Sequence, residues 1–280
     1  MKRQALSLLL IIFIEFIGLN ILSCHKSGQG AESLAYLKEF AKAEVVIEHM
    51  RKQDNPNWNA IREQYNICSK LVKEVDEKNN TDYHKAIQDA IEKCAHNERT
   101  KVNQQTLAKG LQHIAVMKIR DLIGSMANAD KAARKSSAYQ ISALFNGIRP
   151  TFTRRDKDFF HGKKQLEREA DLALTQLKSN NEADYITAAN RLENIINRTY
   201  ALCVLYEMQS IEKLRATDFE QCDVKLAEAA LFNRIIEPKI KKTDRRAHQT
   251  ITVILNAEYS AVNSERLKNA LNRGLSQNIL

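Results

Sequence analysis

Hydrophobic residues recur every three or four positions through most of the chain, the spacing that gathers them on one face of an α-helix. In the first half this pattern predicts helices over Glu32–Arg51, Trp58–Val75 and Val102–Met126, with a further helix starting at Thr81 or Asp82. Pro56 and the polar run that ends at Asn80 separate the first three segments. The pattern therefore indicates consecutive amphipathic helices joined by short polar turns.

The second half follows the same plan. Helices are expected over Lys163–Leu177, Tyr185–Leu214 and Asp244–Leu271, and another begins at Thr217 and is interrupted by Pro238. Between the halves, Asp130–Asn146 is predicted to be a connector helix that ends at Gly147–Pro150. Thr151–Gly162 is then expected to be a basic loop that also carries aromatic residues.

One ordered set of residues occurs twice. The first copy comprises Ile61, Tyr65, Cys68 and Thr81-Asp82-Tyr83, and the second comprises Ile196, Tyr200, Cys203 and Thr217-Asp218-Phe219. The offset is 135 residues at the cysteine and 136 at the Thr-Asp-aromatic run. Amphipathic helices can match by chance, but a nearly constant offset favours a tandem duplication of a four-helix unit. The expected repeats are 32–127 and 163–280, joined by the connector 128–162.

Composition agrees with an all-α protein. Only 8 glycines and 3 prolines occur among 280 residues, so few positions favour turns over helices. The apolar fraction of 44% is enough to form a core, which excludes wholesale disorder.

The N-terminus has the features of an export signal. Lys2 and Arg3 precede an apolar run from Leu6 to Leu22, and Ser23-Cys24 follows. A small residue before a cysteine at the end of such a run resembles the lipobox of bacterial lipoproteins. That resemblance implies that residues 1–23 are a signal peptide, that Cys24 carries the lipid, and that 24–31 form a flexible tether.

The lipobox also implies an exported protein that is anchored in a membrane and faces the periplasm or the cell surface. The alternative is an uncleaved N-terminal membrane anchor, which Glu15 makes less favourable, since a carboxylate in hydrocarbon costs about 3 kcal/mol. Loss of residues 1–23 would lower the net charge from +9 to +8. Nucleic acid is not an expected partner for a protein in that location.

The duplicated helical plan and the envelope location together resemble the imelysin-like and EfeO-like periplasmic proteins, which serve iron uptake or processes near it. The resemblance covers most of the mature chain. It is one of architecture, because the Gly-x-His-x-x-Glu signature of that family is absent from this sequence. No site residue can be transferred from it.

Export would permit disulfides among the remaining cysteines. In a helical hairpin that turns near Thr81, Cys68 and Cys94 are each thirteen residues from the turn, so a disulfide between them is expected to stabilise the fold by about 3 kcal/mol. Cys203 and Cys222 are not level in the corresponding hairpin, and their pairing is expected only by exclusion. The alternative for all four is a small apolar residue in the core.

Two groups of residues are candidates for binding. Arg154, Arg155, Phe159 and Phe160 place cations beside aromatic rings in the predicted loop, which is therefore the expected contact surface. Glu92 and His96 are four residues apart on one helical face and could contribute two ligands to a metal. For both groups, ordinary solvated polar surface is the favoured interpretation.

The sequence contains none of the usual catalytic or cofactor-binding motifs. Neither Gly-x-Ser-x-Gly, a phosphate-binding glycine loop nor Cys-x-x-Cys-His occurs in the mature part, so no cofactor is expected. The expected function is that of a lipid-anchored, non-enzymatic protein that binds an envelope protein or a small ligand. Two alternatives stay open: a periplasmic protein that handles a metal such as iron, and an envelope hydrolase whose catalytic residues are dispersed in the sequence.

Overall fold

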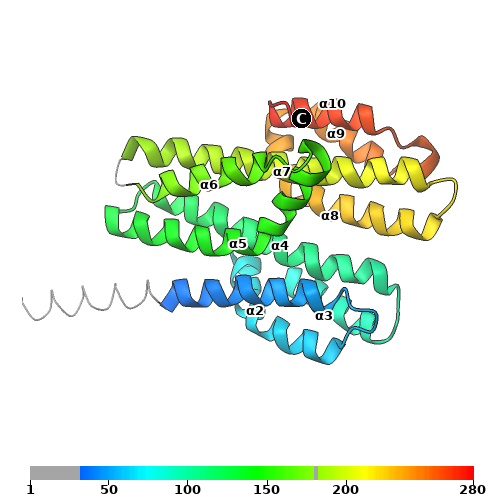
Figure 1. Cartoon of the computed structure of the whole chain (residues 1–280), viewed down its shortest axis with the longest axis horizontal. Coiled ribbons are helices and arrows are strands. Elements are labelled where there is room, and N and C mark those ends of the chain that lie inside the picture. The colour runs from blue at the N-terminus through cyan, green and yellow to red at the C-terminus, as the bar shows by residue number, and fades with distance from the viewer. Residues whose placement is uncertain (1–31, 180–181) are drawn as a thin grey trace, which may run out of the picture.

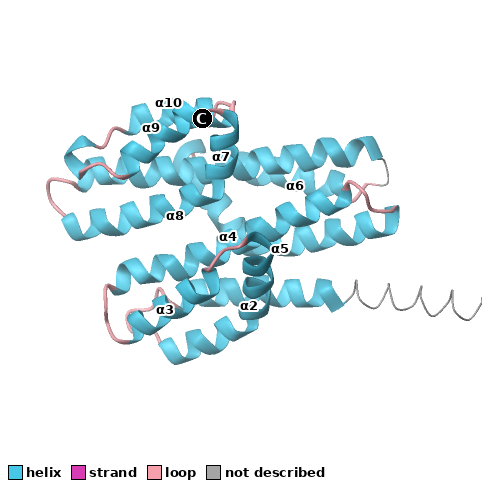
Figure 2. Ribbon diagram, turned by 180° about the vertical axis from the view of Figure 1, so that it is seen from behind, coloured by secondary structure: helices cyan, strands magenta, loops and turns pink. Residues whose placement is uncertain are grey.

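The structure is a computed structural model that describes residues 32–179 and 182–280 (Figure 1). Helices are the only regular elements in these two ranges, so the all-α prediction is confirmed (Figure 2). None of the helices in the described ranges combines the length and the apolar character that a membrane span requires. The predictions for residues 1–23, for Cys24 and for residues 24–31 fall outside the described part of the chain.

Residues 32–50 form the first helix that the structure describes. The helices that follow are α2 (Trp58–Asn79), α3 (Tyr83–Ala95), α4 (Thr100–Met126), α5 (Lys131–Phe160), α6 (Gln165–Leu177), α7 (Glu182–Leu214), α8 (Phe219–Thr243), α9 (Arg245–Leu255), the short 3-10 helix η1 (Tyr259–Ala261) and α10 (Ser264–Leu275). Asparagine or aspartate side chains accept a backbone N–H at the first turn of five of them, namely Asn57, Asp130, Asp218, Asp244 and Asn263.

The helices form two blocks that share one apolar core. In Figure 1 the helix over residues 32–50 lies with α2 and α3 at the bottom, and α8, α9 and α10 lie at the top. Helix α4 packs against α8, while α5 packs against both α4 and α6, so the middle of the molecule belongs to both blocks. Buried residues from the first described helix through to the C-terminus make up a single hydrophobic cluster.

Helix α5 corrects the prediction for the connector. It runs without interruption from Lys131 to Phe160, so the expected end at Gly147–Pro150 and the expected loop over Thr151–Gly162 are both wrong. A proline inside a helix removes a backbone hydrogen bond and costs about 3 kcal/mol. Packing on both sides of Pro150 offsets that cost: Phe145 and Phe152 are fully buried, and their rings meet edge to face with centroids 4.8 Å apart.

The C-terminal segments correct two further predictions. Helix α8 continues through Pro238, with the buried residues Ile236 and Ile240 on either side of it. The single helix expected over Asp244–Leu271 is instead α9, η1 and α10. Because the chain turns after Leu255, α10 can fold back on α9 and bury its own apolar stripe.

The two copies of the repeated residues have only part of their surroundings in common. Tyr65 and Tyr200 are both fully buried, as a shared inward face requires. Tyr83, however, is buried, whereas Phe219 is 66% exposed. Helix α3 has 13 residues and α8 has 25. The duplication therefore stays a prediction.

The start of α3 also differs from expectation. Asp82 occupies the N-cap position, but its side chain makes no capping hydrogen bond. Asp76, in the last turn of α2, accepts from the hydroxyl of Thr81 at 2.6 Å and from the backbone N–H groups of Tyr83 and His84 at 3.0 and 2.7 Å. A carboxylate from the preceding helix therefore fixes this turn.

Candidate functional site

The four cysteines that the structure describes are buried free thiols, so the expected Cys68–Cys94 and Cys203–Cys222 disulfides are wrong. Within the hairpin, the two thiols of the first pair have different neighbours. Cys94 donates to the carbonyl of Thr100 at 3.6 Å. Burial raises the pKa of the Cys68 thiol, and the nearby Glu44 carboxyl group adds to that rise.

The predicted metal pair lies at the surface. The carboxylate of Glu92 is 3.6 Å from Nδ1 of His96 and accepts a hydrogen bond from Arg62 at 2.6 Å. Both side chains of the pair are more than half exposed. No group of three or more potential metal ligands occurs among the described residues. Glu92 and His96 thus form part of a solvated ion-pair network.

The two phenylalanines of the predicted binding group pack against the protein. Both lie in the last turn of α5 and are half-buried. The ring of Phe159 meets Tyr206 edge to face, with centroids 6.3 Å apart, and the guanidinium of Arg198 lies 5.1 Å from the Phe160 centroid. Their aromatic surface is therefore largely used inside the fold.

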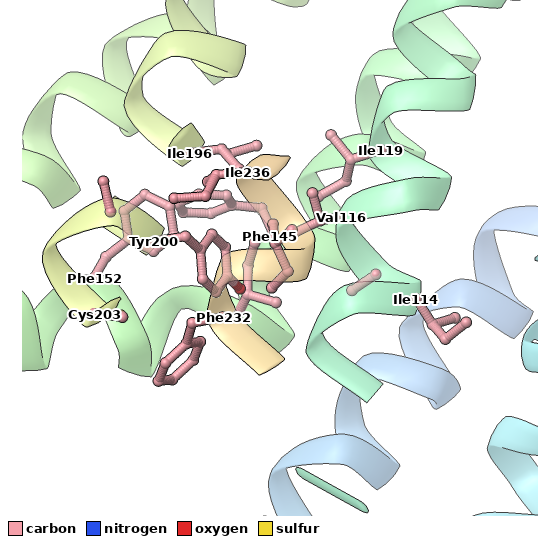
Figure 3. Close-up of a cluster of buried hydrophobic side chains, with 14 of the residues drawn as sticks. Ile114, Val116, Ile119, Phe145, Phe152, Ile196, Tyr200, Cys203, Phe232 and Ile236 are labelled. Carbon is pink, nitrogen blue, oxygen red and sulfur yellow. The ribbon is translucent and has the colours of Figure 1, made fainter. Parts of the chain in front are cut away.

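The two arginines of that group line a partly open cavity of about 130 Å³. Helices α4, α5, α7 and α8 each contribute to its wall. The charged residues of the wall are Lys109, Arg154, Arg155, Glu207, Lys225 and Glu228. Apolar packing continues directly beside it, since Cys203 and Phe232 line the cavity and also belong to the buried cluster around Tyr200 (Figure 3).

The carboxylates of the wall are held mainly by one lysine. The ammonium of Lys225 is 2.8 Å from Glu207 and 2.9 Å from Glu228. Lys109 is 3.8 Å from Glu228 and lies over the ring of Phe232, with its Nζ 4.8 Å from the centroid. The wall therefore carries four cations and two carboxylates, and the lysine–carboxylate distances range from 2.8 to 3.8 Å.

The pKa values of the two carboxyl groups shift in opposite directions. Desolvation and the nearby Glu228 raise the pKa of Glu207 to about 7, against the effect of Lys225. For Glu228, desolvation also acts to raise the pKa, but Lys109 and Lys225 outweigh it and the pKa is lowered. The neighbouring lysines therefore decide the difference between the two carboxyl groups.

Arg155 is the least satisfied of these cations. Its side chain is 8% exposed, its Nη2 pairs with Asp158 at 2.8 Å, and its guanidinium lies 4.1 Å from the centroid of Tyr206. The distance from its Nη1 to the carboxylate of Glu207 is 3.9 Å, which is too long for a hydrogen bond. Nε and Nη1 are buried without an acceptor among the described residues.

A second, smaller cavity of about 40 Å³ adjoins the first, and Arg154 lines both. Its wall includes Glu44, from the helix over residues 32–50, whose two carboxyl oxygens are buried without a hydrogen-bond partner. Desolvation, with a contribution from Glu48, raises the pKa of Glu44 to about 8. Gly147 of α5 passes so close that a Cβ there would collide with the Glu44 carboxyl group.

Sequence reasoning found two residues of this site and missed the others. The sequence predicts Arg154 and Arg155 in an exposed loop, whereas both lie on a helix and line the cavity, Arg155 buried and Arg154 partly exposed. Lys109, Glu207 and Glu228 were not identified, although Lys109 offers a signal: it is a charged residue between the apolar positions Leu107 and Leu111.

Comparison with protein-family models, curated proteins and solved structures gave no significant match. The functional conclusion must therefore come from the geometry of the site itself. The cavity offers fixed charge and hydrogen-bond donors, and its one thiol, Cys203, has a pKa that burial raises to about 11. A thiol of that pKa is a poor nucleophile at neutral pH. This arrangement is suited to binding.

Proposed function

We propose that this chain is a non-enzymatic, lipid-anchored binding protein of the bacterial cell envelope, which holds a small ligand in the cavity between α4, α5, α7 and α8. The observation that supports this proposal is the gathering of charged side chains from four helices, most of them buried, around one partly open cavity. Buried charges generally stabilise a fold less than well-packed apolar residues would. Titratable groups with shifted pKa values in a cavity are typical of functional sites.

The contacts of the carboxylates favour a small organic or inorganic ligand over a metal ion. Glu207 and Glu228 both pair with Lys225, so a metal would have to displace the ammonium group from each of them. Metal sites in proteins need several ligands that are free of such competition. The cationic excess of the wall is also unfavourable for a cation.

Anchoring at Cys24 rests on the apolar run and on Ser23-Cys24, and the ligand site rests on the folded helices. These two parts can be tested together by expressing the full-length chain and its C24A variant. We expect the wild-type protein in the membrane fraction and the variant either in the soluble fraction or as an unprocessed precursor. Native mass spectrometry should show a small molecule bound to each folded form and released on denaturation.

The outcomes separate the two parts of the proposal. A C24A variant that is processed and membrane-bound like the wild type would refute the lipid anchor. A native mass equal to the covalent mass, in protein isolated without acid or denaturant, would contradict the binding role.

A further inference from the structure

We propose that the ligand in the central cavity is a small oxyanion, a phosphate or carboxylate group, held chiefly by Arg155. This inference rests on the proposed function and specifies the chemical class of the ligand.

The size of the cavity selects a ligand of a few non-hydrogen atoms. A water molecule occupies about 30 Å³ in the liquid, so a cavity of about 130 Å³ has room for roughly four of them. A phosphate, sulfate or short carboxylate has a similar volume. A nucleotide or a peptide is too large to be held within a cavity of this volume.

The charges of the wall favour an anion. Four cations face two carboxylates, and both carboxylates are already paired with Lys225. Lys109 adds only a long contact of 3.8 Å to Glu228. The two remaining cations, Arg154 and Arg155, lie on α5 and pair with carboxylates that do not line the cavity, Glu48 at 3.5 Å and Asp158 at 2.8 Å. An anion in the cavity would therefore be bound through the donors of Arg155 that Asp158 leaves unused.

Arg155 supplies the donors. Its Nη2 is engaged by Asp158 at 2.8 Å, whereas its Nε and Nη1 are buried and have no acceptor among the described residues. A buried donor without an acceptor is unfavourable, and a charge-assisted hydrogen bond to an oxyanion would remove that cost. Guanidinium is the group that most often recognises phosphate and carboxylate in proteins.

Arg154 is the most exposed cation of the cavity wall. Its side chain is 39% exposed, and its contacts to Glu48 and Thr151 are long, at 3.5 and 3.4 Å. Contacts of this length hold a side chain weakly. The charge of Arg154 would attract an anion from solvent toward Arg155.

Thermal unfolding and titration calorimetry of the full-length protein in detergent test this site, with inorganic phosphate and acetate as probes and chloride at equal ionic strength as the reference. We expect saturable stabilisation by phosphate or acetate and none by chloride. The R155Q variant should bind the effective anion about 10- to 100-fold more weakly, since each hydrogen bond to a charged group contributes about tenfold or more.

A matched control is available on the same helix. Arg149 forms an exposed bidentate pair with Asp171, at 3.1 and 2.7 Å, and does not line the cavity. The R149Q variant should bind the anion as the wild type does. If R155Q does not fold, R154Q carries the test, because Arg154 is more exposed and is expected to weaken binding in the same direction.

Two results would overturn the inference. Anion binding that R155Q and R154Q leave unchanged would place the site elsewhere. Absence of saturable stabilisation by either probe would exclude the oxyanion class. In that second case, native mass spectrometry that still shows a bound uncharged molecule would leave the binding role intact, whereas an empty protein would refute both proposals.

Discussion

Ionisation of Glu44 should set how the stability of this fold depends on pH. The side chain belongs to the helix over residues 32–50 and is buried against α5, where Gly147 leaves just enough room for the carboxyl group. Neither of its oxygens has a hydrogen-bond partner within the described part of the chain. Desolvation raises its pKa to about 8, Glu48 adds to the rise, and Lys109 opposes it.

The direction of the pH effect follows from these two protonation states. An unfolded glutamate ionises near its ordinary pKa of 4.5, whereas the folded carboxyl group keeps its proton up to about pH 8. The folded state therefore binds more protons than the unfolded state between these values. The contribution of Glu44 is most favourable below pH 4.5, is lost as pH rises toward 8, and is constant above that.

The change in the free energy of unfolding that Glu44 causes is limited by the size of its pKa shift. Each unit corresponds to about 1.4 kcal/mol, so the full shift would remove at most about 5 kcal/mol between pH 4.5 and 8. Local rearrangement that admits water to the carboxylate would reduce this to about 2 kcal/mol. Either value is a large fraction of the stability of a typical domain.

Urea unfolding of the wild type and of E44Q at pH 5 and pH 8.5 measures this contribution. Glutamine has the same size and cannot ionise, so the variant should gain about 2–4 kcal/mol relative to the wild type between the two pH values. E63Q, at an exposed position of α2, is the control and should show no such gain. A difference between wild type and E44Q that is equal at both pH values would refute the assignment of a buried, uncharged Glu44.

Two further predictions concern packing and the thiols. In G274A the new Cβ would lie 2.6 Å from Cγ2 of Ile240, so urea unfolding should show a loss of about 1–3 kcal/mol, whereas G124A, with nothing within 4 Å, should gain about 0.5–1 kcal/mol; equal effects would contradict this packing. A thiol reagent, used without reductant, should react slowly with the folded protein and should label four thiols after unfolding, namely Cys68, Cys94, Cys203 and Cys222. If the unfolded protein shows none of these four thiols, both predicted disulfides are present after all.

Helix positions could be predicted where the local apolar spacing agrees with the final packing. The predicted start of a helix at Trp58 and the predicted ends at Met126 and Leu214 coincide with the limits of α2, α4 and α7. The same reasoning failed at Pro150 and Pro238, because the local cost of a proline is offset by tertiary contacts that no local pattern records. Buried aromatic and isoleucine neighbours supply those contacts.

The site could be predicted only in part, because its residues are dispersed over four helices. The sequence predicts Arg154 and Arg155 as binding residues because they are neighbouring cations, and the structure places both at the cavity. Glu207 and Lys225 are eighteen positions apart in sequence, on different helices, and each resembles a solvated charge when seen alone. Their pairing at 2.8 Å depends on how α7 packs against α8.

The apolar packing beside the cavity shows that the charges are not needed to fill the centre of the molecule. Phe232 lines the cavity, and its ring centroid is 5.8 Å from that of Tyr200 in the buried apolar cluster (Figure 3). A chain selected for stability alone could extend this packing across α5 and α8 and avoid the desolvation of Arg155. An anion bound between Arg155 and the opposite wall would compensate for the desolvation of Arg155. Without the anion, that desolvation remains uncompensated. Ligand binding and the association of the two helical blocks should therefore strengthen each other, since the cavity wall belongs to both.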